Sequence, residues 1–111
     1  MATDKDFLQY ILDHLDPVFP VRAKMMFGEY GLFAEGKMFA VICDNKLFFK
    51  PTDKGRVFIR DVIEAPPYPG AKNYFLIEDK IEDRKWLSQL IEITIAELPI
   101  PKKRKRRKKQ P

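Results

Sequence analysis

The stretch that decides the fold is EYGLFAEGKMFAVICDNKLFFK, residues 29–50. Apolar and aromatic residues are dense in it, and two polar pairs, Glu35-Gly36 and Asp44-Asn45, interrupt them. Glycine, asparagine and aspartate tolerate the positive φ angles that a two-residue hairpin turn requires. The stretch therefore predicts three antiparallel strands, over 30–34, 37–43 and 46–50, joined by two tight hairpins.

Two-residue loops also set the register of these strands, because they pair Ala34 with Lys37 and Cys43 with Lys46. One face of the sheet is then expected to carry Phe33, Met38, Ala40, Ile42, Leu47 and Phe49. The other face is expected to carry Tyr30, Leu32, Phe39, Val41, Cys43 and Phe48. A sheet with one face in water alternates apolar with polar residues, whereas both of these faces are apolar. Each face is therefore expected to be covered, either by helices or by a second copy of the sheet.

Upstream of this stretch, apolar residues recur at helical spacing between Phe7 and Leu15, which predicts an N-terminal helix. Asp16-Pro17 ends that helix, because the residue before a proline is pushed out of the helical region. Residues 24–27 read as one more strand, which passes into the hairpins through Gly28.

Downstream, Thr52 is suited to cap a short helix that runs through Ile63. The residues of that helix expected to face the core are Val57, Phe58 and Val62. Residues 73–77 read as a fifth strand, and Asp79 is suited to cap a last helix that ends near Leu98, before two prolines. The fold class predicted is α+β: an antiparallel β-meander of about five strands, with an N-terminal, a short middle and a C-terminal helix packed on it.

The charge of the chain is unevenly distributed. Of 111 residues, 21 are Lys or Arg and 16 are Asp or Glu, for a net charge of +5. Eight of the cations are consecutive, and without them 13 basic and 16 acidic residues leave a net charge of −3 on residues 1–101. We therefore expect two parts, an α+β domain over residues 1–100 and a disordered basic tail over residues 101–111.

The eight consecutive cations are the candidate nucleic-acid-binding residues. They are Lys102, Lys103, Arg104, Lys105, Arg106, Arg107, Lys108 and Lys109. A run of like charges without apolar residues favours a solvated segment, and such a segment binds DNA or RNA by releasing counterions. No aromatic residue interrupts the run, so the binding it predicts is independent of base sequence and sensitive to salt. The alternative is a solvated tail with incidental affinity only.

Compartment follows from what the sequence lacks. Cys43 is the only cysteine, which excludes an intramolecular disulfide. The first residues are polar and charged, unlike a signal peptide. The longest apolar run, residues 38–43, is far short of the ~20 residues of a membrane-spanning helix. A cytoplasmic protein without a membrane partner is the expectation.

The residues that commonly carry catalysis are few and scattered. His14 is the only histidine and Ser88 the only serine, and no triad or set of three or four metal ligands is apparent. Cys43 lies in a predicted strand and reads as a buried structural thiol. We therefore expect no enzyme, no catalytic residue, no metal site and no cofactor.

Two surface features leave alternatives open. Arg22, Lys24 and Lys37 form either a basic edge of the sheet or ordinary solvated positions, and lysine at a sheet edge also opposes edge-to-edge pairing. Tyr68, in a proline-rich loop, is either a partner contact or a lid over the core, and the lid is favoured. Gly31 reads as a position where a bulge or a close approach of strands is required.

The runs KMMFGEYGLF at residues 24–33 and GKMFA at residues 36–40 resemble the signature of the TfoX N-terminal domain family, and the similarity extends over roughly residues 5–98. The resemblance implies a small α+β domain with helices packed on an antiparallel sheet, and no catalytic residues. Its best-known members, TfoX or Sxy, regulate competence genes in bacteria and carry a second, C-terminal domain, where this sequence has the basic run. Members of this fold group dimerise, which agrees with two apolar sheet faces.

These observations predict a non-enzymatic regulatory or interaction module. It would be a DNA-associated regulator of transcription or competence that forms a homodimer, with residues 102–109 giving sequence-independent binding to nucleic acid. The alternative is a protein–protein adaptor or dimer without a nucleic-acid role, in which the basic run only aids solubility.

Overall fold

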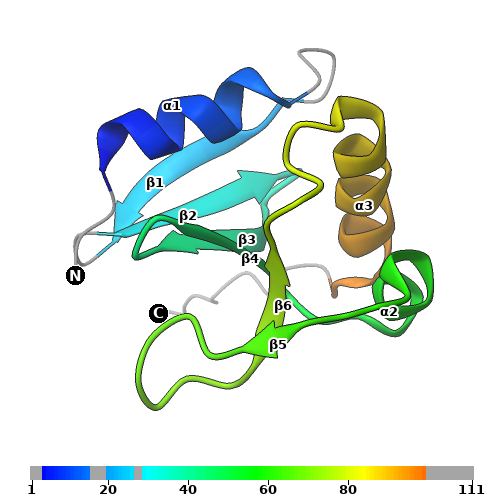
Figure 1. The fold of residues 1–111 in the computed structure, drawn as a ribbon. Helices are drawn as coiled ribbons and strands as arrows, with labels where there is room; N and C mark the ends of the chain where they lie inside the picture. The colour runs from blue at the N-terminus through cyan, green and yellow to red at the C-terminus, as the bar shows by residue number, and fades with distance from the viewer. Residues whose placement is uncertain (1–3, 16–19, 27–28, 100–111) are drawn as a thin grey trace, which may run out of the picture.

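The computed structural model describes residues 4–15, 20–26 and 29–99. Its elements are α1 (Lys5–Asp13), β1 (Arg22–Met26), β2 (Glu29–Ala34), β3 (Lys37–Cys43), β4 (Lys46–Phe49), α2 (Asp53–Ile59), β5 (Glu64–Ala65), β6 (Tyr74–Ile77) and α3 (Arg84–Glu97). The six strands form one antiparallel sheet in the order β1-β2-β3-β4-β6-β5 (Figure 1). The predicted α+β class, the meander and the three helices are confirmed, and the short edge strand β5 is one more than the five strands expected.

Both predicted hairpins are present with the predicted turns. Glu35 and Gly36 have φ angles of 52° and 77°, and Asp44 and Asn45 have φ angles of 51° and 57°. Positive φ at both central residues is the conformation whose twist matches that of antiparallel strands. The expected pairs, Ala34 with Lys37 and Cys43 with Lys46, are confirmed.

The predicted assignment of side chains to the two faces is wrong in part, because β3 contains a bulge. Leu32 pairs with Ala40 and Phe33 pairs with Met38, so Phe39 is an extra residue without a partner in β2. One extra residue reverses which face the following side chains occupy.

Two groups of residues therefore change face. Tyr30, Leu32 and Phe39 lie with Ala40 and Ile42 in the main core. Met38 lies on the opposite side, with Val41, Cys43 and Phe48. Phe33 shares that side, because it pairs directly with Met38.

The helices pack on one face of the sheet, which we call the helical face. In Figure 1, α1 runs alongside β1 and β2, while α3 and α2 lie next to each other at the other end. The main core joins this face to the helices, and its most completely buried side chains include Ile11 from α1 and Leu87, Leu90 and Ile91 from α3. Against them lie Phe39 and Phe49, whose ring centroids are 5.5 Å apart.

The cap of α2 is confirmed, but its predicted end is wrong. The Thr52 hydroxyl accepts a hydrogen bond from the Gly55 amide at 3.0 Å. The helix ends at Ile59 because Arg60 takes a φ of 74°, after which the chain turns into β5. Val57 is 76% exposed, so the expectation that it faces the core is also wrong.

The last helix begins later than predicted and ends where predicted. Asp83, not Asp79, caps it, and its carboxylate accepts from the Trp86 amide at 3.1 Å. Residues 79–82 form turns instead of a first helical turn. The helix stops at Leu98, immediately before Pro99, as proline geometry requires.

Polar contacts fix the end of α3 to its neighbours. The Glu97 carboxylate accepts from the amides of Asp53 at 2.9 Å and of Lys54 at 3.0 Å, which are the first two residues of α2. The bonds from Lys54 and Asp53 lower the pKa of Glu97. The ammonium of Lys37 donates to the Ile95 carbonyl at 2.9 Å. Lys37 is therefore part of the scaffold and not of a free basic edge.

Candidate functional site

The candidate nucleic-acid-binding cations at residues 102–109 lie outside the described residues, as does Gly28. The site must therefore be sought on the body of the molecule. None of the helices in the described ranges combines the length and the apolar character needed to cross a membrane.

Among the described residues, the potentially reactive side chains of the body do not form a catalytic or metal-binding group with one another. His14 donates from Nδ1 to the Tyr10 carbonyl at 2.8 Å, at the end of α1. Burial, followed by the charge of Glu29, raises the pKa of the Cys43 thiol to about 11, so the thiol stays protonated near neutral pH. The Ser88 hydroxyl meets no hydrogen-bonding partner within the described ranges. Nor do those ranges bring three His, Cys, Asp or Glu side chains together as a metal would need.

The most distinctive surface of the body is the sheet face opposite the helices, which we call the open face. Its buried residues are Val41, Cys43 and Phe48, and Met38, Ala65, Tyr74 and Leu76 pack against them. All seven belong to strands. Within the described residues, helices cover only one face of the sheet, so of the two covers expected, helices or a second copy of the sheet, helices account for one face alone.

Gly31 lets the side chains at the β1 end of the open face pack closely. A Cβ atom at this position would lie 3.0 Å from the sulfur atoms of both Met26 and Met38, and 3.2 Å from Cε1 of Phe33. The sequence-based reading of Gly31 as a close-approach position agrees with this geometry, although side chains and not a second backbone make the approach. Methionine side chains are flexible and polarizable, so they form an adaptable floor beside the Phe33 ring.

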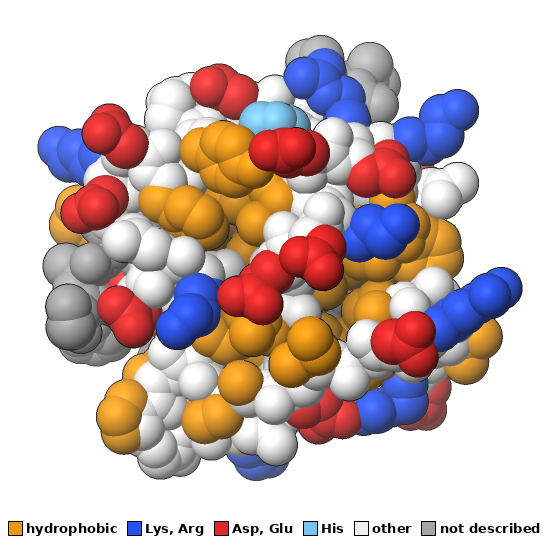
Figure 2. All heavy atoms as spheres, in the orientation of Figure 1, with side chains coloured by type: hydrophobic (Ala, Val, Ile, Leu, Met, Phe, Trp, Pro, Cys, Tyr) orange, Lys and Arg blue, Asp and Glu red, His pale blue; other side chains and the backbone are white. Residues whose placement is uncertain are grey.

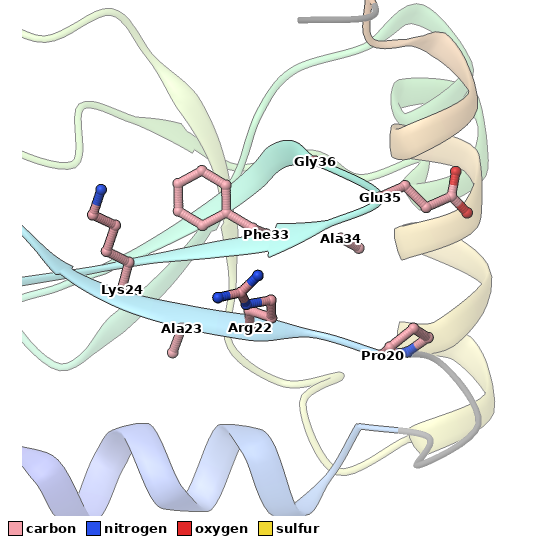
Figure 3. Close-up of a pocket in the computed structure, with 8 residues that line it drawn as sticks. All are labelled: Pro20, Arg22, Ala23, Lys24, Phe33, Ala34, Glu35 and Gly36. Carbon is pink, nitrogen blue, oxygen red and sulfur yellow. The ribbon is translucent and has the colours of Figure 1, made fainter.

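Two cations flank that ring. Arg22 pairs across the strands with Phe33, and Lys24 pairs with Gly31, which places both cations on the open face. Figure 3 shows Arg22, Lys24 and Phe33 pointing to the same side of the sheet, while Ala23 points toward α1. Both cations are exposed, and neither forms a salt bridge with a carboxylate of the described residues.

A hollow of about 540 Å³ lies beside these side chains, at the edge of the sheet. It is lined by Pro20, Arg22, Ala23, Lys24, Phe33, Ala34, Glu35 and Gly36 (Figure 3). In that view the Glu35 carboxylate points away from Phe33, toward α3. The volume is within the range of ligand-binding pockets, about 300–1,000 Å³.

The face of the molecule seen in Figure 2 has a different charge distribution. In the view of Figure 2, carboxylates and cations intermingle, with apolar side chains showing between them. On the body of the molecule, Arg56 of α2 and Glu64 of β5 form an ion pair at 2.7 Å. Arg56 and Lys80 also lie over aromatic rings, 5.2 Å from the centroid of Phe75 and 5.9 Å from that of Trp86. The cations of β1 differ because they stand on strands of the open face.

The far end of the open face is more apolar. Tyr68, on the loop between β5 and β6, is 60% exposed, so the expectation of a lid is wrong. Burial, and then the neighbouring Tyr68 and Cys43, raise the pKa of Tyr74, which places these three groups near one another. Lys46, the first residue of β4, shares the open face with Phe48. Burial lowers the pKa of Lys50, the residue that follows β4.

Sequence reasoning identified Arg22 and Lys24 as a possible basic edge, but it missed their aromatic neighbour. Phe33 was assigned to the opposite face because the regular register of the hairpin conceals the bulge at Phe39. Nothing in the residue types around Phe39 distinguishes a bulge from a regular strand, so the pattern carried no signal for this site.

The structure thus defines a small α+β module whose sheet is covered by helices on one side and presents strand side chains on the other. Residues 13–98 match the family model of the TfoX N-terminal domain. The chain belongs to the TfoX N-terminal domain family, as the resemblance indicated. It is also 40% identical, over 111 residues, to an uncharacterized 12.7 kDa protein in the trpE 5′ region of Spirochaeta aurantia, a match that spans 100% of this chain and 96% of that protein.

Proposed function

We propose that this protein is a non-enzymatic regulatory module that binds nucleic acid and associates with protein, including a second copy of itself. Membership of the TfoX N-terminal domain family supports a regulatory or competence-related role. The observation that carries the proposal is the open face, an apolar sheet surface that none of the described helices covers and that Arg22, Lys24 and Lys46 border.

The nucleic-acid part of the proposal rests on charge. Residues 1–101 carry a net charge of −3, so the eight cations at 102–109 are the densest positive charge available to a polyanion. We propose that they form a mobile tail beyond the domain of residues 1–100 and hold DNA or RNA without reading its sequence. If about five phosphates are contacted, the logarithm of the affinity for duplex DNA should fall with the logarithm of salt with a slope of about −4.5.

Neutralising the tail tests this role. The eight cations at 102–109 are replaced by glutamine, and binding to a labelled DNA duplex is followed by fluorescence anisotropy over a salt series. We expect the salt slope and most of the affinity to be lost. The control replaces Lys5, Lys54, Lys72, Lys80 and Lys85, exposed lysines of the body, with glutamine, and it should retain most of both. Unchanged affinity after neutralisation of 102–109 would contradict the proposal.

A protein–protein adaptor or homodimer without a nucleic-acid role is the second candidate. The exposed apolar side chains Val57, Ile63 and Tyr68 favour it. Ile63 and Tyr68 flank β5, the edge strand farthest from β1, next to the apolar end of the open face. Self-association at this end would leave the cations of β1 accessible.

Light scattering over a range of protein concentrations tests this candidate. We expect a dimer at micromolar concentration that the replacement of Ile63 and Tyr68 by serine shifts to monomer. The control replaces Met25, which is exposed on the side of the sheet that faces α1, and should leave the dimer intact. A wild-type chain that stays monomeric at all concentrations would rule out the homodimer.

A further inference from the structure

We infer that the β1 end of the open face binds single-stranded nucleic acid, with an unpaired base stacked on Phe33 and phosphates held by Arg22 and Lys24. The inference rests on the proposed nucleic-acid role and deepens it. It adds a preference for unpaired strands, which the cations at 102–109 cannot supply because no aromatic residue stands among them.

The geometry supplies the two elements that single-strand recognition requires. An aromatic ring on a sheet surface offers a stacking platform, and cations beside it follow the phosphate backbone. Arg22 lies directly across from Phe33, and Lys24 lies two residues further along β1, on the same face. Figure 3 shows both cationic side chains on the same side of the sheet as the ring, with the Arg22 guanidinium close to it and Lys24 further along β1.

The surroundings of the Phe33 ring favour a ligand with a flat ring over a ligand that offers negative charge alone. Met26 and Met38 approach the backbone at Gly31 beside the ring, so its floor is apolar and can adjust to different bases. The adjoining hollow of about 540 Å³ has room for a group of nucleoside size. An acidic peptide would satisfy the two cations but would leave the ring without a function.

A base-paired duplex fits this site poorly. Its bases are stacked within the helix, and only an unpaired base presents a free face to an aromatic ring. Duplex DNA is therefore expected to depend on the cations at 102–109, whereas a single strand uses both these cations and the sheet site. The two modes of binding can be separated by substitution.

The test uses the full-length chain and three labelled probes, a deoxythymidine 12-mer, a uridine 12-mer and a 12-base-pair duplex, followed by fluorescence anisotropy. Phe33→Leu keeps an apolar side chain but removes the ring. We expect it to weaken binding of the single strands by roughly tenfold, because one stacked base is lost. The affinity for the duplex should stay within about twofold of the wild-type value. Phe33→Tyr, which retains the ring, should restore binding.

A second variant does not depend on the packing of Phe33. Replacing Arg22 and Lys24 with glutamine removes two exposed cations and should make the salt slope for the single strands shallower by about 1.4. Lys54→Gln with Lys85→Gln is the matched control, because it removes two exposed lysines from α2 and α3. It should leave the slope close to that of the wild type. This pair of variants decides the question if Phe33→Leu fails to fold.

Several results would overturn the inference. The first is equal affinity of the wild type for single strand and duplex. The second is unchanged single-strand binding in a folded Phe33→Leu variant. The third is competition by polyglutamate against the uridine 12-mer that is equally strong in Phe33→Leu and in the wild type. The last result would identify an acidic protein partner instead. None of them touches the nucleic-acid part of the proposed function, which fails if neutralising 102–109 leaves duplex binding unchanged. Binding of single strands that depends on Phe33 but not on 102–109 would support the inference and would contradict the proposal that the cations at 102–109 hold nucleic acid.

Discussion

The two faces of the sheet use the same strands for different purposes. On the helical face, 17 buried residues from the sheet, α1, α3 and the chain between β6 and α3 form one cluster, whereas three buried residues form the cluster of the open face. Adjacent residues of β4 illustrate the division, since Phe49 belongs to the first cluster and Phe48 to the second. Burial of apolar area is the main stabilising contribution to folding, so the helical face should account for most of the stability.

The comparison also separates what the fold requires from what a partner would use. Side chains packed between helices and sheet have little freedom to serve a ligand, because interiors are tightly packed. The open face carries exposed cations, half-buried methionines and an aromatic ring. Substitutions on the two faces should therefore affect different measurements, stability on one and binding on the other.

Truncating one phenylalanine on each face should give the largest contrast. Phe39 is fully buried in the main core, and Phe39→Ala is expected to lower the free energy of unfolding by about 3–5 kcal/mol. Phe33→Ala, on the open face, should cost less, about 1–2 kcal/mol, because its side chain is only partly buried. Urea denaturation followed by circular dichroism measures both. Equal losses would mean that the open face is as tightly packed as the core.

Gly55 tests how closely the helical side fits together. A Cβ atom there would lie 2.5 Å from the Thr52 hydroxyl and 3.5 Å from the Phe75 ring. We expect Gly55→Ala to displace the helix cap and lower the free energy of unfolding by about 1–2 kcal/mol, although alanine is the better helix former by about 1 kcal/mol.

The control for this prediction is Val57→Ala in the same helix. Val57 is exposed, so its truncation should change the free energy of unfolding by less than about 0.5 kcal/mol. A Gly55→Ala variant that is more stable than the wild type would show that the cap and the rings beside it can move.

Gly31 poses the equivalent question on the open face. Its neighbours are the flexible ends of Met26 and Met38 together with the Phe33 ring, so an added methyl group can push them aside. We expect Gly31→Ala to cost about 1 kcal/mol, the lower end of the range for overpacking.

Truncation of a neighbour should relieve this strain. In a double-mutant cycle, Gly31→Ala combined with Met38→Ala should cost less than the sum of the single changes. Strict additivity, measured by thermal unfolding, would mean that the methyl group does not meet the methionine sulfur.

The smallest effect is expected from the polar contact between α3 and α2. Hydrogen bonds from Lys54 and Asp53 lower the pKa of Glu97 below the ordinary carboxyl value of 4.5. A carboxylate with a lowered pKa stabilises the fold above that ordinary value, and the contribution is lost as the pH falls through the lowered pKa.

Glu97→Gln keeps an acceptor oxygen but removes the charge. The variant should melt slightly below the wild type at pH 7, and the difference should shrink as the pH falls below about 4.5. Melting curves between pH 3 and pH 7 measure it. A difference that stays constant with pH would exclude the charge of Glu97 as its cause.

The hairpins were predictable because their determinants are local. Two residues with positive φ at 35–36 and at 44–45 fix the pairing beside each turn, and the residue types show it. The bulge at Phe39, by contrast, depends on how the whole strand packs. The start of α3 also depends on packing, because Asp83 and Asp79 are equally good helix caps by residue type. The candidate site was predictable only in its charges, Arg22 and Lys24, since the ring beside them follows from the pairing of β1 with β2, which no polar turn pair signals in the sequence.

The bulge also bears on how the chain can change. Because Phe39 is the one residue of β3 without a partner in β2, a deletion at this position would put β3 back into regular alternation, leave Phe33 and Met38 on the open face, and remove a fully buried ring from the main core. A deletion at any other position of β3 would instead move the side chains beyond it to the other face, unless a second bulge compensated for it.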